Sequence, residues 1–158
     1  MYESWIANHI DAQNNGFRHG VPYERAISEL ESGRKQTHWV WYVFPQWVGL
    51  GTSREVQRFG VPSIRAATQY LGHPTLRANY FRAISATRSH LDSGTALTRI
   101  LRSPDDRKFV SSLTLMEQAV NQSDTWDNLS AQMQEILQIA QEQGFDRCQR
   151  TLAWLENE

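Results

Sequence analysis

The stretch SPDDRKFVSSLTLMEQAV, residues 103–120, has the pattern of a helix with a sharply defined start. Ser103 is expected to cap the helix, Pro104 fits its first turn, and Asp106 stands where a capping-box partner would stand. These capping roles leave Asp105 without a required structural duty. Its carboxylate is therefore a candidate to accept a ribose hydroxyl or to activate a water molecule, with capping alone as the alternative.

Hydroxyl side chains interrupt the middle of this predicted helix. Ser111 and Thr114 lie three residues apart and share one helical face, and Lys108 lies one turn before Ser111. Serine and threonine are mediocre helix formers, so a polar face turned inward needs hydrogen-bond partners. Two interpretations stay open. Either these side chains contact a ligand, or the hydroxyls bond to backbone carbonyls of their own helix.

Apolar residues recur at helical spacing along the rest of the chain. The spacing predicts helices over residues 2–13, 22–33, 53–59, 62–72, 74–91, 97–101, 126–144 and 146–155. Strand-like alternation is nearly absent, although HWVWYVF, residues 38–44, has the composition of a strand. No repeat or Ser/Gly-rich linker divides the sequence. We therefore expect an all-α fold, a single compact domain over residues 1–158 with about eight helices.

The composition is that of an ordinary globular protein. The 158 residues are 40% hydrophobic and 21% charged, enough to bury a real core. The longest apolar run, residues 39–44, is far shorter than the about 20 residues that span a bilayer, and the N-terminus lacks signal-peptide features. Cys148 is the single cysteine, which excludes an internal disulfide. These features predict a cytoplasmic protein that does not contact a membrane.

Charge is unevenly distributed along the chain. The net charge is −1, but residues 124–158 carry −5, so the first 123 residues carry +4. A net charge near zero provides no electrostatic footprint for duplex nucleic acid. The distribution instead favours a small anionic ligand near the N-terminal two-thirds of the chain.

The segment GRKQTHWVWYVFPQ, residues 33–46, places cations next to aromatic side chains. Arg34 and Lys35 either pair with the C-terminal dipole of the preceding helix or bind phosphate. Trp39 and Trp41 either pack in the core or stack on a purine or nicotinamide ring. His38, between the cations and the aromatic run, is a candidate catalytic residue.

A glycine-containing loop, GLGTS at residues 49–53, follows this segment. Gly49 and Gly51 permit a nest of backbone N–H groups, and Ser53 stands at a helix N-terminus, a combination that binds anions. The same residues equally fit an ordinary turn with a helix cap. With Gln46, they complete the candidate ligand-binding residues of this part of the chain.

Motifs of the common catalytic and metal sites are absent from the sequence. GLGTS lacks the Gly-Lys-Ser/Thr ending of a P-loop, and Arg54 stands where the dinucleotide fingerprint needs a third glycine. There is no HExxH or GxSxG motif, and the five histidines are scattered. We therefore expect no metal site and no cofactor.

Five motifs occur in an order that resembles a known family. They are YERAISELESGRKQTHWVWYVFPQ, GLGTS, YLGHPTLR, SPDDRKFVSSLTL and CQRTL. This order resembles the bacterial family called domain of unknown function 1810, some of whose members carry the label calpastatin. The resemblance covers the chain from about Trp5 to Leu155 and implies an all-α fold, without an established activity. The recurrent positions of the family correspond to Arg34, Lys35, His38, Trp39, Trp41, Phe44, Pro45, Gln46, Gly49, Gly51, Ser53, His73, Pro74, Ser103, Asp105, Asp106, Lys108, Ser111, Ser112, Thr114 and Thr151.

A looser similarity is to the YbiA-like proteins, small helical domains linked to ADP-ribose and other N-glycosidic metabolites. It rests on a tryptophan-rich segment near a lysine, a later helix with a leucine stripe and an acidic turn. This similarity implies N-glycosidic chemistry on a compound derived from ADP-ribose.

The leading hypothesis is a domain that binds a small anionic, nucleotide-derived ligand, with hydrolysis of an N-glycosidic bond as its candidate reaction. In this hypothesis Arg34 and Lys35 hold a phosphate, and Trp39 or Trp41 stacks on the base. Asp105 contacts the ribose or activates water. Two alternatives stay open: an interaction domain that presents an aromatic–arginine patch to a protein partner, and a protein that sequesters a signalling nucleotide without turnover.

Overall fold

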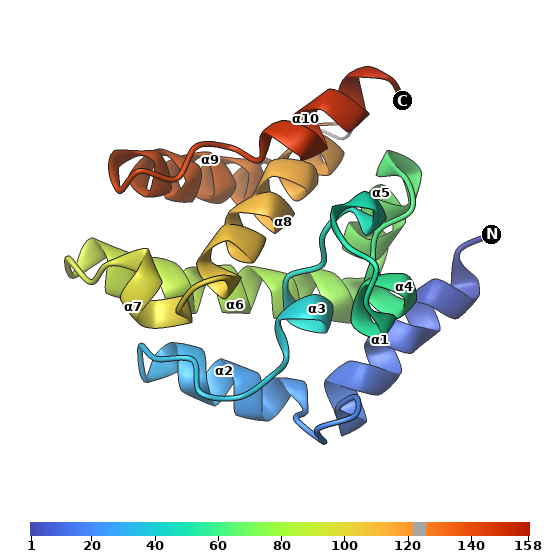
Figure 1. Ribbon diagram of the computed structural model, residues 1–158, viewed down its shortest axis with the longest axis horizontal. Coiled ribbons are helices and arrows are strands. Elements are labelled where there is room, and N and C mark those ends of the chain that lie inside the picture. Colours follow the sequence, from blue (N-terminus) through green and yellow to red (C-terminus); the bar gives the residue numbers. More distant parts are fainter. Residues whose placement is uncertain (122–125) are drawn as a thin grey trace.

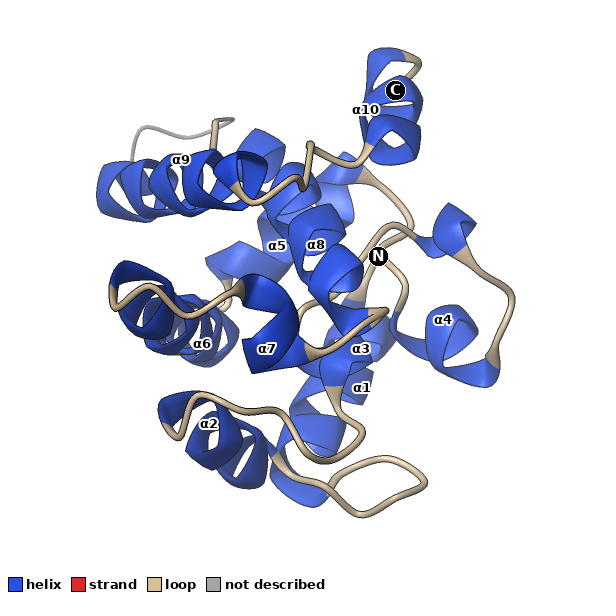
Figure 2. Cartoon of the chain, turned by 60° about the vertical axis from the view of Figure 1, so that its left-hand side comes forward, coloured by secondary structure: helices blue, strands red, loops and turns tan. Residues whose placement is uncertain are grey.

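The computed structural model describes residues 1–121 and 126–158, where the chain forms ten α-helices, one 3-10 turn and no strand (Figures 1 and 2). Asp124, one of the acids counted in the C-terminal segment, lies outside these residues. The elements are α1 (Glu3–Asn15), α2 (Tyr23–Glu31), α3 (Val40–Val43), η1 (Val48–Leu50), α4 (Arg54–Phe59), α5 (Ile64–Gly72), α6 (Pro74–Asp92), α7 (Leu97–Leu101), α8 (Asp105–Val120), α9 (Asp127–Glu142) and α10 (Gln149–Glu156). The prediction of an all-α fold is confirmed.

Helix α8 is the centre of the packing. Every side chain from Phe109 to Val120 except Gln118 is buried, because α5, α7, α9 and α10 all pack against it (Figure 1). A helix that is buried around most of its circumference shows no narrow apolar stripe. Its hydroxyls bond locally: Ser111 Oγ donates to the Arg107 carbonyl at 3.0 Å, and Thr114 Oγ1 donates to the Val110 carbonyl at 2.8 Å. The second interpretation of these hydroxyls therefore describes the structure.

The start of α8 differs from the sequence-based expectation. Ser103 does not cap the helix, because Pro104 occupies the N-cap position and no side chain accepts a hydrogen bond from the first turn there. Asp106 instead accepts a hydrogen bond from the Thr98 hydroxyl of α7 at 2.9 Å and one from the Arg107 amide at 2.8 Å. The predicted capping box is wrong because Asp106 ties α8 to the preceding helix.

The aromatic segment after α2 forms one helical turn, α3, so the strand alternative for residues 38–44 is wrong. Its side chains are fixed by tertiary contacts. The Tyr42 hydroxyl donates to the Val21 carbonyl at 2.6 Å, and the Phe44 ring packs edge-on against Phe109 at 4.8 Å. The predicted helix over residues 97–101 is present as α7, and α3 is the one α-helix of the described residues for which no helix was predicted.

Several helices begin at a proline or end next to a glycine, close to the boundaries predicted from the sequence. Gly33, at φ +82°, follows α2 in the left-handed conformation of a helix stop. His73 precedes α6, its Nδ1 accepts a hydrogen bond from the Leu76 amide at 3.4 Å, and Pro74 occupies the first turn. None of the described helices combines the length and apolar character needed to cross a membrane.

A buried carboxylate fixes the loop between α2 and α3. Glu29 is 5% exposed. It accepts hydrogen bonds from the Gln36 amide at 2.7 Å, the Thr37 amide at 2.9 Å, the Thr37 hydroxyl at 2.6 Å, the Trp39 indole at 2.8 Å and the Arg25 guanidinium at 2.9 Å. Burial alone would raise the pKa of Glu29, but the hydrogen bonds from Thr37, Trp39 and the backbone amides outweigh it and lower the pKa to about 2.

We expect the Glu29→Gln substitution to lower the free energy of unfolding by about 2–4 kcal/mol, because it replaces a charged acceptor with an amide that cannot accept five donors. Urea unfolding at pH 7 measures the change. Glu24→Gln, on the exposed face of the same helix, is the matched control and should change stability by less than about 0.5 kcal/mol.

A comparison of the wild type with Glu29→Gln at different pH values also tests the pKa of Glu29. A carboxyl whose pKa falls from 4.5 to about 2 on folding stabilises the folded state above pH 4.5. That stabilisation is lost as the pH falls from 4.5 toward 2. The unfolding free energy of the wild type should therefore drop more steeply over this interval than that of Glu29→Gln. Parallel pH profiles would contradict the assignment.

Candidate functional site

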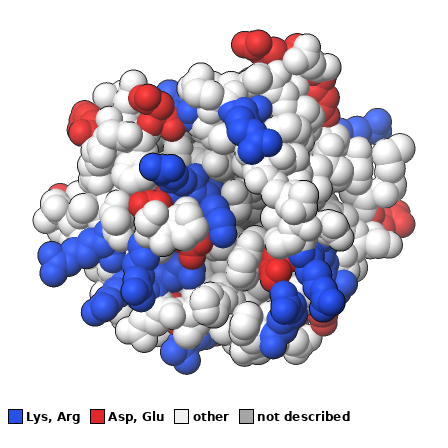
Figure 3. Space-filling model, in the orientation of Figure 1, with Lys and Arg blue, Asp and Glu red and all other residues white. Residues whose placement is uncertain are grey.

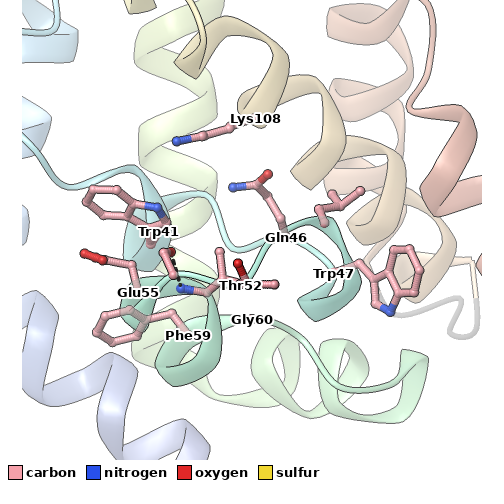
Figure 4. A pocket seen from close by; sticks show the side chains of 12 residues that line it. Trp41, Gln46, Trp47, Thr52, Glu55, Phe59, Gly60 and Lys108 are labelled. Atoms are coloured by element: carbon pink, nitrogen blue, oxygen red, sulfur yellow. Dashed lines mark hydrogen bonds between the residues drawn. The ribbon is translucent and has the colours of Figure 1, made fainter.

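A cavity of ≈ 420 Å³ opens between α3, the loop before α4, α4 itself and the first turns of α8 (Figure 4). Its walls are formed by Trp41, Gln46, Trp47, Leu50, Gly51, Thr52, Ser53, Glu55, Val56, Phe59, Gly60 and Lys108. Lys108 and Gln46 enter from one side, with Trp41, Glu55 and Phe59 facing them (Figure 4). We call this space the Trp41 cavity.

Backbone hydrogen bonds hold the loop that closes the cavity. Val61 donates to the Gln46 carbonyl at 2.7 Å, and Val48 donates to the Val61 carbonyl at 3.0 Å. Gly60 permits this close approach, because a Cβ there would lie 2.4 Å from the Val56 carbonyl oxygen. The loop and α4 are therefore one wall with a defined shape.

The last helix supports the same loop from outside. The indoles of Trp47 and Trp154 stack at 4.9 Å with an interplanar angle of 12°. Arg150, also on α10, donates a hydrogen bond to the Gly49 carbonyl at 3.1 Å. Gly49 is packed tightly here, since a Cβ at this position would lie 2.3 Å from the Trp47 ring.

Two lysines share one carboxylate at the rim of the cavity. Asp105 Oδ2 lies 2.7 Å from Lys35 Nζ, and its Oδ1 lies 3.5 Å from Lys108 Nζ. Lys108 Nζ also lies 5.2 Å from the centroid of the Trp41 ring, in cation–π geometry. Asp105 thus has a structural partner in Lys35, which sequence reasoning did not reveal.

These ion pairs leave the cavity with a net positive charge. Lys35, Asp105 and Lys108 together carry +1, since two ammonium groups face one carboxylate. On the opposite wall Glu55 is neutralised by Arg18, whose Nη1 lies 3.2 Å from Oε1 and 3.0 Å from Oε2. The uncompensated charge therefore resides at Lys108, whose side chain is 30% exposed.

Several residues selected from the sequence come together in this cavity. They come from separate elements: Trp41 from α3, Gln46, Gly51 and Ser53 from the loop before α4, and Lys108 from α8. The proposed anion nest does not form, because Gly51 is extended at φ −168° and neither loop glycine has a positive φ. Ser53 acts as a helix cap and accepts a hydrogen bond from the Val56 amide at 3.2 Å.

The remaining selected residues lie elsewhere. Trp39 is 0% exposed, so it is a core residue rather than a stacking platform. Thr114 is also fully buried and accepts a hydrogen bond from the Cys148 amide at 3.1 Å. His38 is exposed beside His19, with ring centroids 4.9 Å apart.

Two further selected residues line other depressions. Arg34 belongs to a hollow formed with α7, and Ser111 to one beside Cys148. Among the described residues, no group of three or more His, Cys, Asp and Glu side chains is placed to hold a metal ion.

Sequence reasoning missed more than half of the cavity wall. Glu55, Val56 and Phe59 are on α4, whose helical spacing was recognised but whose inner face was not assigned to a site. The spacing of Val56 and Phe59 was the available signal. Nothing in the sequence indicated that Arg18 would reach Glu55.

The fold and cavity define a small helical protein with a concave, positively charged site formed by α3, α4 and α8. A family model described as "Protein of unknown function (DUF1810)" matches residues 4–144, and the chain belongs to this family. It is also similar to the crystal structure of the conserved hypothetical protein Rv1873 from Mycobacterium tuberculosis. The TM-score is 0.80 at 28% identity, over 98% of each chain. No curated protein matches the sequence.

We expect the ion pair between Lys35 and Asp105 to be structural. Their side chains are 7% and 16% exposed, so Asp105→Asn leaves a nearly buried ammonium without its carboxylate and should cost about 3 kcal/mol of unfolding free energy. Lys35→Met should cost a similar amount. The double variant should cost at least about 1 kcal/mol less than the sum of the two, as measured by denaturant unfolding.

Asp146→Asn, an exposed carboxylate of the same type, is the control and should leave stability unchanged. If Asp105→Asn were as stable as the wild type, the carboxylate would not be held for structural reasons, and its candidacy as a catalytic group would be strengthened.

Proposed function

We propose that this protein binds a small, nucleotide-derived anion in the Trp41 cavity. The observation that carries the proposal is the pairing of a partly buried indole with an incompletely neutralised ammonium: Trp41 and Lys108 line one space, and Lys108 Nζ lies 5.2 Å from the Trp41 ring centroid. An aromatic face binds a planar ring, and an ammonium binds a phosphate.

The size of the cavity limits the ligand. A volume of ≈ 420 Å³ is near the lower end of the range of about 300–1,000 Å³ typical of small-molecule sites. It suits one ring system with a short substituent better than an entire dinucleotide. The ligand is therefore a mononucleotide-sized compound, or the terminal part of a larger one such as ADP-ribose.

Polar side chains on the wall supply orientation. Gln46 offers an amide donor and an acceptor, and Thr52 offers a hydroxyl. Ser53 Oγ accepts a hydrogen bond from the Val56 amide, which leaves its hydroxyl proton free to be donated. These groups match the edge of a base or the hydroxyls of a ribose.

Binding has more support from the geometry than hydrolysis. Asp105, the residue selected as a water activator, is not among the residues that line the cavity and is paired with both lysines. The carboxylate that does line it, Glu55, is paired with Arg18. A general base needs a free carboxylate within reach of the substrate, so a protein that sequesters its ligand fits better than a hydrolase.

A protein-interaction domain is the second candidate, and one surface feature favours it. Phe81 is 42% exposed, and the Arg77 guanidinium lies 5.7 Å from the centroid of the Trp126 ring in the same depression. This is an aromatic–arginine patch of the kind that this alternative requires.

Thermal-shift measurements against mononucleotides, NAD, ADP-ribose and cyclic dinucleotides test the proposal. A ligand at one hundred times its Kd stabilises the folded state by about 2.7 kcal/mol, which should raise the unfolding midpoint by about 5–10 °C. Chromatography of the recovered ligand distinguishes sequestration from turnover. If no anionic compound shifts the midpoint, the interaction domain becomes the better hypothesis.

Variants of the two central residues locate the binding. Trp41→Leu and Lys108→Met should each weaken binding at least about tenfold, because each removes a stacking or charge-assisted contact. Lys108→Arg should retain most of the affinity. Trp126→Leu, which removes a tryptophan outside the cavity, is the control. Full ligand response in Trp41→Leu would exclude this cavity.

A further inference from the structure

A second hollow, separate from the Trp41 cavity, collects three arginines. It has a volume of ≈ 490 Å³ and is lined by Gly33, Arg34, Thr95, Thr98, Arg99 and Arg102. None of these residues lines the Trp41 cavity. We propose that this arginine hollow is a binding site for a di- or triphosphate group.

The loop after α2 and the helix α7 form the hollow together. The Lys35 amide donates a hydrogen bond to the Ile100 carbonyl at 2.7 Å, and the Arg34 amide donates to the Glu29 carbonyl at 3.0 Å. These two bonds attach the loop to α7 on one side and to α2 on the other. Arg34 therefore shares the hollow with Arg99 and Arg102, more than sixty residues away in sequence.

The three guanidinium groups are not neutralised by the described part of the protein. In residues 1–121 and 126–158, none of them has a side-chain hydrogen bond or ion pair. The two segments that form the hollow, residues 32–38 and 93–104, contain no Asp or Glu. Figure 3 shows Lys and Arg side chains gathered over α7 and the end of α2.

The acidic residues next to the hollow already have other partners. Glu29 holds the Gln36–Trp39 loop and Arg25, and Asp105 is shared by the two lysines. Asp106 is buried and bonded to the Thr98 hydroxyl and the Arg107 amide. The positive charge of the hollow therefore has to be balanced by ions from solution or by a ligand.

Arg102 adopts a backbone conformation that favours glycine. Its φ of 64° and ψ of 148° fall at the edge of a region occupied almost only by glycine. A glycine would meet the backbone requirement at this helix end without steric cost. The sequence nevertheless has an arginine here, which indicates that the guanidinium has a use of its own.

The chemistry of the lining selects the class of ligand. Guanidinium groups bind phosphate oxygens through paired N–H donors. Three of them match the charge of a phosphate chain better than that of a single phosphate, and the Thr95 hydroxyl adds a donor at the wall. No aromatic side chain lines the hollow, so it recognises the phosphates rather than a base.

Isothermal titration with inorganic tripolyphosphate at low ionic strength tests this inference. We expect saturable binding by the wild-type protein, and a loss of affinity of at least about tenfold in Arg99→Ala and in Arg102→Gly. Arg102→Gly should also keep or raise the thermal unfolding midpoint, because glycine relieves the backbone strain. A drop in affinity with undiminished stability separates a binding role from a structural one.

Arg65→Ala, which removes an exposed arginine on α5, is the matched control and should bind as the wild type does. Orthophosphate should bind at least about tenfold more weakly than tripolyphosphate, since it occupies fewer guanidinium groups. A nucleoside triphosphate that binds no tighter than tripolyphosphate identifies the phosphate chain as the ligand, whereas much tighter binding identifies a nucleotide.

Absence of tripolyphosphate binding would overturn the inference, and so would equal binding by the wild type, Arg99→Ala and Arg102→Gly. Trp41→Leu should leave tripolyphosphate binding intact. The experiments can therefore reject the proposal for the arginine hollow without rejecting the proposal for the Trp41 cavity, and the reverse.

Discussion

The Glu29 carboxylate fixes the loop on which both candidate sites depend. A charge is stable in a protein interior only when hydrogen bonds replace its lost hydration. Glu29 meets this requirement with five donors, four of them from the Gln36–Trp39 segment and one from Arg25. The loop consequently has one conformation relative to α2, and the positions of Arg34, Lys35 and Trp41 follow from it.

Asp105 divides the positive charge in and around residues 33–46 into two separate regions. By pairing with Lys35 at 2.7 Å, it neutralises the cation between Arg34 and the aromatic turn. The remaining positive charge lies at Lys108 on one side and at Arg34, Arg99 and Arg102 of the arginine hollow on the other. The segment GRKQTHWVWYVFPQ therefore contributes to two surfaces and to the core, whereas the leading hypothesis from the sequence assigned Arg34, Lys35 and one tryptophan to a single ligand.

Most helices were predicted well because their signals are local in the sequence. The helical spacing of Leu76, Tyr80 and Ile84 is one such signal, and the glycine at position 33 that ends α2 is another. The α3 turn and the start of α8 were predicted incorrectly because tertiary contacts determine them. Phe44, which follows α3, packs against Phe109, and Asp106 at the start of α8 accepts a hydrogen bond from Thr98 of α7. The same limit applies to the site. Trp41, Gln46, Ser53 and Lys108 were selected by residue type, but their convergence and the inclusion of Glu55 depend on tertiary packing that periodicity does not encode.

The indole stack between Trp47 and Trp154 makes the shape of the Trp41 cavity a property of the whole fold. Trp47 lines the cavity, and its outer partner belongs to α10, more than one hundred residues further along the chain. Arg150 of the same helix also donates a hydrogen bond to the Gly49 carbonyl, so α10 contacts the loop that carries Trp47 at two points. The shape of the cavity opening thus depends on the docking of a helix that contributes none of the described side chains of the cavity wall.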